Sequence, residues 1–133
     1  MWYPTLLCWT SLTFLIPYML SASRNLPSYV SWGILGTTIT SQLYHGSHPR
    51  NKTIMLIDII TCHTTIGGHI IYALTRCNPW TPNVLAMYAS ILYAFVTFWV
   101  FKLSHKHPYW HAILHLATCG GSIALMLDDA CML

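Results

Sequence analysis

The stretch TIMLIDIITCHTTIGGHIIYAL, residues 53–74, contains a single charged residue, Asp58. A helix needs about 20 mostly apolar residues to cross the hydrocarbon core of a bilayer, and this stretch is long enough. The rest of the chain has the same character, because 7% of its 133 residues are charged and 55% are hydrophobic. Soluble domains carry about 25% charged residues. The sequence therefore predicts an integral membrane protein and excludes a soluble globular domain, a disordered chain and a coiled coil.

Four further apolar stretches flank this one, and a charge, a proline or both separate each from the next. Together they predict a single all-α transmembrane domain over residues 1–133, with five spans at about 5–22, 28–44, 53–74, 83–103 and 109–127. Short loops make neighbouring helices antiparallel. Pro17 predicts a kink within the first span. The small residues 21–23 also resemble a signal-peptide cleavage site, but no basic segment precedes this apolar stretch, which argues against that alternative.

The basic residues predict how the bundle is oriented. Four fall on the side of the N-terminus, here called side A: Arg50, Lys52, Lys102 and Lys106. Two fall on the opposite side, here called side B: Arg24 and Arg76. Because loops rich in Lys and Arg stay in the cytosol, we expect side A to be cytosolic. The net charge of +3 is too scattered to predict a nucleic-acid partner.

Histidines are frequent for so apolar a chain, which contains 8 of them. Ser41 and His45 lie four residues apart at the end of the second predicted span, and His111 and His115 lie four apart at the start of the fifth. Residues at this spacing share one face of a helix, and such a histidine pair presents two imidazoles to one metal ion. Asp58 is the only acid inside a predicted span, and an ionisable residue there marks a functional site by default.

The antiparallel topology places all five of these residues at similar depth near side A. Three neutral imidazoles with an open fourth position are the ligands of catalytic zinc, so we predict Zn²⁺ bound by His45, His111 and His115. Water bound to such a zinc ionises near neutral pH. Asp58 would then act as a base or orient that water, and Ser41 would hydrogen-bond the substrate or the developing oxyanion.

The order Ser41-x-x-x-His45, Asp58 early in the next span and His111-x-x-x-His115 in the last span resembles the CREST superfamily. This group includes alkaline ceramidases, progestin and adipoQ receptors, and hemolysin III relatives. The resemblance covers about residues 41–58 and 111–121. It implies zinc bound inside a helix bundle and hydrolysis of amide or ester bonds in a membrane lipid, with ceramide as the best-established substrate class. Family members typically have seven spans, whereas this sequence predicts five.

Two other functions stay open on the sequence alone. A receptor-like or accessory membrane protein, in a homo-oligomer or a larger membrane complex, would keep the metal for structure or lack it. A b-type haem carrier would need imidazoles on opposite faces of one macrocycle, which two histidines on one helix face do not provide.

Other features of the sequence concern packing. The polar residues Thr61, Thr65 and His69 continue from Asp58 along one face of the predicted helix, and His63 lies deep in the same span. We interpret these side chains as forming hydrogen bonds between helices, in preference to a path for protons or substrate. The glycine pairs 67–68 and 120–121 predict close approach of helices. On side B, Cys77 and Cys131 could form a disulfide if that side faces an oxidising compartment.

Overall fold

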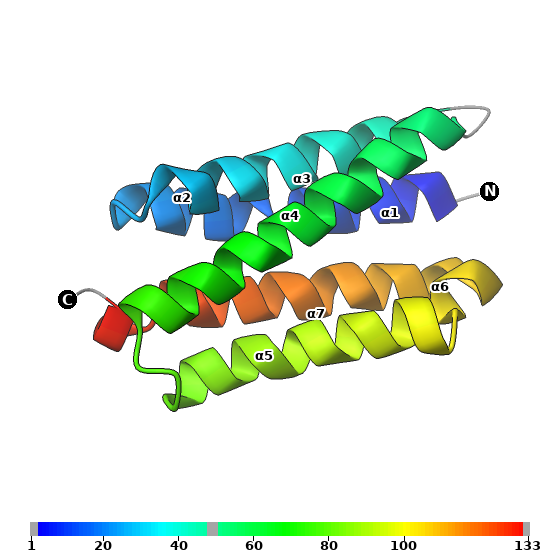
Figure 1. Cartoon of the computed structure of the whole chain (residues 1–133). Helices are drawn as coiled ribbons and strands as arrows, with labels where there is room; N and C mark the ends of the chain where they lie inside the picture. Colours follow the sequence, from blue (N-terminus) through cyan, green and yellow to red (C-terminus); the bar gives the residue numbers. More distant parts are fainter. Residues whose placement is uncertain (1–2, 48–50, 132–133) are drawn as a thin grey trace.

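The computed structural model describes residues 3–47 and 51–131, and this part of the chain contains helices and no β-strand (Figure 1). The helices are α1 (Tyr3–Leu12), α2 (Leu15–Ser23), α3 (Ser28–Gly46), α4 (Lys52–Arg76), α5 (Pro82–Phe95), the π-helix η1 (Val96–Val100), α6 (Leu103–Lys106), α7 (Pro108–Met126) and the 3-10 helix η2 (Asp129–Cys131). The predicted all-α class is confirmed. Arg50, which contributed to the predicted orientation, lies outside the described residues.

Three helical stretches in the described chain are long and apolar enough to cross a membrane. They are Thr5–Ser23, Lys52–Arg76 and Pro82–Val100, and they coincide with three of the five predicted spans. Helices α3 and α7 are also 19 residues long, but serine, threonine and histidine side chains make them less apolar. The helices are thus consistent with the membrane protein that the composition predicts.

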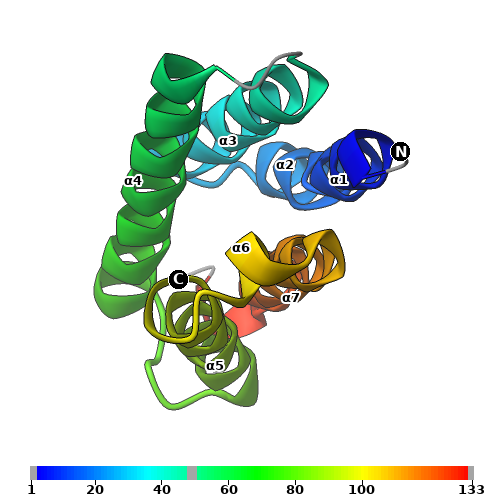
Figure 2. The same cartoon turned by 90° about the vertical axis from the view of Figure 1, so that its right-hand side faces the viewer.

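Two helix pairs form the bundle. Helix α4 packs along α3, and α5 packs along α7, while α1 and α2 pack against both α3 and α7 and so join the two pairs. Helix α4 runs obliquely, from beside the end of α3 to the start of α5 (Figure 1). The end view shows α4 and α7 on different sides of the bundle (Figure 2). This arrangement leaves the cleft described below between α4 and the α5–α7 pair.

The first predicted span is broken into α1 and α2, and Pro17 explains the position of the break. Proline lacks a backbone N–H, and its ring clashes with the carbonyl four residues earlier, which here belongs to Thr13. The chain leaves the helix at Thr13 and Phe14, one turn before the proline. The carbonyl of Thr13 accepts hydrogen bonds from the Ile16 N–H at 3.0 Å and from the Cys119 thiol of α7 at 3.3 Å. The predicted kink is therefore present, and it helps to join α1 to α7.

The fourth predicted span ends earlier than residue 103. Helix α5 widens into the π-helix η1, in which the Phe101 N–H bonds to the carbonyl of Val96 at 2.9 Å. Lys102 then adopts a left-handed backbone with φ of 51°. An α-helix cannot continue through that conformation, so the chain turns into the short helix α6. The boundary predicted at Leu103 is wrong for this reason.

The side B end of the bundle contains an apolar core and a disulfide. The buried core residues there include Val30, Ile34, Tyr72, Met87 and Leu125. A disulfide joins Cys77, which follows α4, to Cys131 of η2, so this suggested pairing is confirmed. The Tyr72 hydroxyl donates to the carbonyl of Cys131 at 3.2 Å, and Arg24 forms an ion pair with Asp129 at 2.5 Å. The end of α4 is thereby fastened to the segment after α7.

Close packing of α5 and α7 depends on Gly121. A Cβ atom at this position would lie 1.8 Å from the Ser90 hydroxyl oxygen and 3.4 Å from the Met87 Cα, so no larger residue fits without a shift of α5. Gly67 and Gly120 have no neighbouring atoms within 4 Å of such a Cβ. The close approach predicted for the two glycine pairs is therefore correct for Gly121 and wrong for Gly67 and Gly120.

We expect the Cys77–Cys131 disulfide to contribute about 2–4 kcal/mol to the free energy of unfolding, because it links residues 54 positions apart. The double variant Cys77→Ser/Cys131→Ser should therefore unfold at a lower temperature than the parent chain in detergent micelles. Cys8→Ser, which removes a free thiol, is the matched control and should unfold with the parent. Equal unfolding temperatures for all three proteins would contradict the prediction.

Candidate metal centre

Three histidines from two helices form one cluster near the side A end of the bundle. His45 lies in the last turn of α3, and His111 and His115 lie one turn apart near the start of α7. One ring nitrogen of each lies within 4.8 Å of those of the other two. His45 and His115 are buried and His111 is half-buried. The structure thus brings together the three residues predicted as metal ligands.

The cluster could hold a metal ion after a small adjustment. Nitrogens at 2.0–2.1 Å from one tetrahedral zinc lie about 3.3 Å apart, so the imidazoles would have to move slightly inward. The rings already contact one another, with centroids 4.7–5.2 Å apart. These contacts fill the space that a haem plane between two of the rings would need, so the cluster does not fit a b-type haem. Imidazole ligands suit zinc and also copper, iron and nickel.

Thr10 of α1 sets the tautomer of His115. Its hydroxyl oxygen lies 3.2 Å from the carbonyl oxygen of Leu7 and 3.0 Å from Nδ1 of His115. With the hydroxyl proton on the Leu7 carbonyl, Thr10 accepts the Nδ1–H of His115, and the Leu7 carbonyl is itself a backbone partner of this ring. Nε2 then carries the lone pair that a metal ion needs. Such outer hydrogen bonds orient metal-binding histidines. No pattern in the sequence around Thr10 predicts this contact with His115, because single threonines are common in apolar helices.

Gln42 holds α1 against the histidine-bearing end of α3. Its side-chain amide donates to the carbonyl of Cys8 at 2.6 Å and to the hydroxyl of Ser11 at 2.5 Å. Gln42 lies between Ser41 and His45 in the sequence, and the Ser-x-x-x-His motif predicts no role for it. By fixing α1 beside α3, it also keeps Thr10 in place.

The two residues predicted as catalytic are bonded to each other. The Ser41 hydroxyl donates to Oδ1 of Asp58 at 2.8 Å, and Thr40 donates to the same oxygen at 2.8 Å. The Cys62 thiol lies 3.8 Å from it. Asp58 is buried, with 6% of its surface exposed. All the hydrogen bonds described for this carboxylate meet Oδ1, and Asp58 is one of the residues that line the cleft described next.

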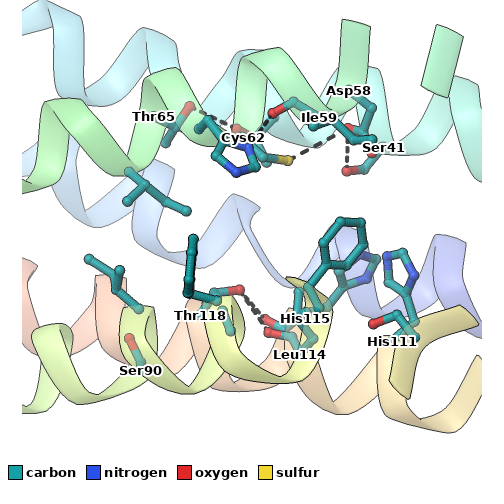
Figure 3. Close-up of a pocket in the computed structure, with 18 of the residues that line it drawn as sticks. Ser41, Asp58, Ile59, Cys62, Thr65, Ser90, His111, Leu114, His115 and Thr118 are labelled. Atoms are coloured by element: carbon teal, nitrogen blue, oxygen red, sulfur yellow. Dashed lines mark hydrogen bonds between the residues drawn. The ribbon is translucent and has the colours of Figure 1, made fainter. Parts of the chain in front are cut away.

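A cleft of about 400 Å³ is lined by four of the five predicted site residues, and His45 is not among the residues that line it. Ser41 and Asp58 lie on one wall, and His111 and His115 lie on the opposite wall (Figure 3). Most of the remaining lining is apolar and includes Ile59, Ile66, Ile91, Phe95 and Leu114. The cleft therefore combines a polar end near side A with an apolar interior.

The polar residues predicted to form a stripe on α4 differ in their hydrogen-bond partners. Thr65 bonds to the Thr37 hydroxyl and the Gly33 carbonyl of α3, both at 2.8 Å, and His63 accepts a hydrogen bond from the Trp99 indole of η1 at 3.1 Å. Thr61 instead donates to a carbonyl of its own helix. The predicted bonds between helices are present for Thr65 and His63, and His69 is described below.

Comparison of the chain with protein-family models, curated proteins and solved structures found no match. The resemblance to the CREST superfamily therefore remains a prediction that depends on the quoted motifs.

We expect the purified parent chain to carry stoichiometric zinc and His111→Ala to lose it, because two imidazoles remain where three would bind. Elemental analysis of the protein after gel filtration measures this. His63→Ala removes an exposed histidine outside the cluster and should keep the metal. Zinc at parental stoichiometry in His111→Ala would contradict the ligand assignment.

We expect Thr10→Val to weaken zinc binding by about 10–100-fold, because His115 loses the acceptor that holds its Nδ1–H. Competition with a chromophoric chelator gives the affinity. Thr10→Ser keeps the acceptor and should restore binding. Thr13→Val is the control in the turn directly after α1, since the Thr13 hydroxyl bonds to a backbone carbonyl and not to His115. Parental affinity in Thr10→Val would rule out this role for Thr10.

Proposed function

We propose that the chain is a membrane-embedded, zinc-dependent hydrolase that cleaves amide or ester bonds of membrane lipids. The observation that carries the proposal is a cluster of three imidazoles, two of which line the same cleft as a buried carboxylate. Zinc in such a site makes water acidic enough to ionise near neutral pH. The order of the motifs, which resembles that of the CREST superfamily, supports the same activity.

The shape of the cleft supports a lipid as the substrate. Ligand sites are mostly apolar, with a few polar groups that fix the orientation of the ligand, and the described lining follows this pattern. A lipid chain would lie along the apolar interior between α4 and α5. Its amide or ester group would then reach the polar end near side A, between Asp58 and His111.

Asp58 is the residue suited to move a proton in this site. Its Oδ1 is engaged by Ser41 and Thr40, which leaves Oδ2 to accept a proton from the attacking water or to orient it. The direction of the Ser41 hydrogen bond makes this serine a positioning residue for Asp58. Thr40 shares this positioning role, and a contact of Ser41 with the substrate or oxyanion stays a prediction from the sequence.

We also propose that α3 and α7 cross the membrane together with the three more apolar stretches, with side A in the cytosol. The close packing of α3 on α4 and of α7 on α5 supports five spans. The disulfide supports the orientation, because disulfides form and persist in oxidising compartments. Cys77 and Cys131 would then lie on the luminal or extracellular side, and the histidine cluster on the cytosolic side.

We expect the zinc-loaded chain to release fatty acid from ceramide in mixed micelles, measured by mass spectrometry of the products. Asp58→Asn should retain zinc and lose about 10²–10⁴-fold in turnover, because the amide cannot accept the proton. Asp129→Asn makes the same change at an exposed acid on side B and should keep parental turnover.

Zinc bound stoichiometrically by the parent chain, with no lipid product from amide or ester substrates, would overturn the hydrolase. That outcome would favour the receptor-like or accessory membrane protein, in which the metal supports structure alone.

A further inference from the structure

At the far end of the cleft from the three histidines, a histidine and a serine bridge α4 and α7. Nε2 of His69 lies 3.1 Å from the hydroxyl oxygen of Ser122, and Nδ1 of His69 lies 2.8 Å from the carbonyl oxygen of Thr65. His69 and Ser122 both line the cleft. Only 4% of the surface of His69 is exposed, so the cleft is the route by which a ligand reaches this pair.

The direction of these hydrogen bonds follows from the Thr65 carbonyl. A carbonyl only accepts, so Nδ1 of His69 carries the proton and Nε2 carries the lone pair. The Ser122 hydroxyl must therefore donate to Nε2. A hydroxyl beside a base, with that base oriented by a third group, is the structural signature of an activated nucleophile.

The neighbouring hydroxyls of the cleft have different partners. Ser90 donates to the carbonyl of Met87 at 2.7 Å, and Thr118 donates to the carbonyl of Leu114 at 2.8 Å. Each of these bonds stays within one helix, as expected of serine and threonine in an apolar helix. Ser122 differs because its hydrogen-bond acceptor is a base that can take up the proton.

The distance along α7 separates this pair from the candidate metal centre. Ser122 follows His115 by two helical turns, which is about 10 Å at 1.5 Å per residue. The hydroxyl is thus too far away to be a ligand of a metal held by the three histidines. Apolar side chains, among them Ile66 and Ile91, also line the cleft.

We propose that Ser122 is a metal-independent nucleophile toward acyl esters that enter the cleft, with His69 as its base. The hydroxyl oxygen of Ser122 bonds to the ester carbonyl carbon, and its proton passes to Nε2 of His69. The bond to the leaving alcohol breaks, and the departing oxygen takes that proton. The products are a free alcohol and an acyl group on Ser122, which water releases as a carboxylic acid with the same proton relay.

Diisopropyl fluorophosphate tests the nucleophile directly. A bond forms between Ser122 oxygen and phosphorus, the phosphorus–fluorine bond breaks, and fluoride leaves while His69 takes the serine proton. In the full-length chain in detergent, peptide mass spectrometry should find the diisopropylphosphoryl group on Ser122. Ser90 is the internal control in the same cleft and should stay unmodified, because its hydroxyl faces a carbonyl.

Two variants and one treatment separate this proposal from the others. Ser122→Ala should abolish the modification, and His69→Gln should slow it by about 100-fold or more. Prior treatment with a zinc chelator should stop metal-dependent turnover but leave the labelling of Ser122 unchanged. Failure of the proposed metal hydrolase can therefore be distinguished from failure of this proposed nucleophile.

An unmodified Ser122 in the parent chain overturns the proposal even if neither variant folds. Equal modification of Ser90 and Ser122, or a parental rate in His69→Gln, overturns it as well. In each of these cases the His69–Ser122 hydrogen bond serves helix packing alone.

Discussion

A polar side chain inside an apolar bundle must find its hydrogen-bond partner within the protein, and the arrangement of these helices depends on that constraint. Many hydroxyls meet it locally, as when Thr75 donates to the carbonyl of Ile71. Those that reach across connect helices: Ser21 bonds to Ser31, and Thr65 bonds to Thr37. The same need explains why Asp58 is surrounded by hydroxyl donors.

The features that could be predicted from the sequence are those that depend on neighbouring residues. Helix length, apolar composition and the four-residue spacing of His111 and His115 are local properties, so the helical class and the histidine cluster follow from them. The position of Asp58 near the side A end of its span also follows from counting residues along the predicted helix. Even the break in the first span follows from Pro17, although its position one turn earlier requires knowing which carbonyl the ring displaces.

The features that could not be predicted depend on contacts between distant parts of the chain. Thr10 and His115 are 105 positions apart, and 53 positions separate His69 from Ser122. No local pattern distinguishes Thr10 or Ser122 from threonines and serines that bond within their own helix. The end of the fourth helix could not be predicted either, because the left-handed turn falls at Lys102 and not at a glycine.

The disulfide gives the bundle a permanent cross-link at one end, and a metal ion on the three histidines would give it a reversible one at the other. A ligand that binds only the folded state adds stability in proportion to the logarithm of its free concentration. The contact between α3 and α7 near His45 would thus strengthen or loosen with the supply of metal, while the far end would respond to the redox state of its compartment. Each end of one small bundle would then sense a different chemical condition.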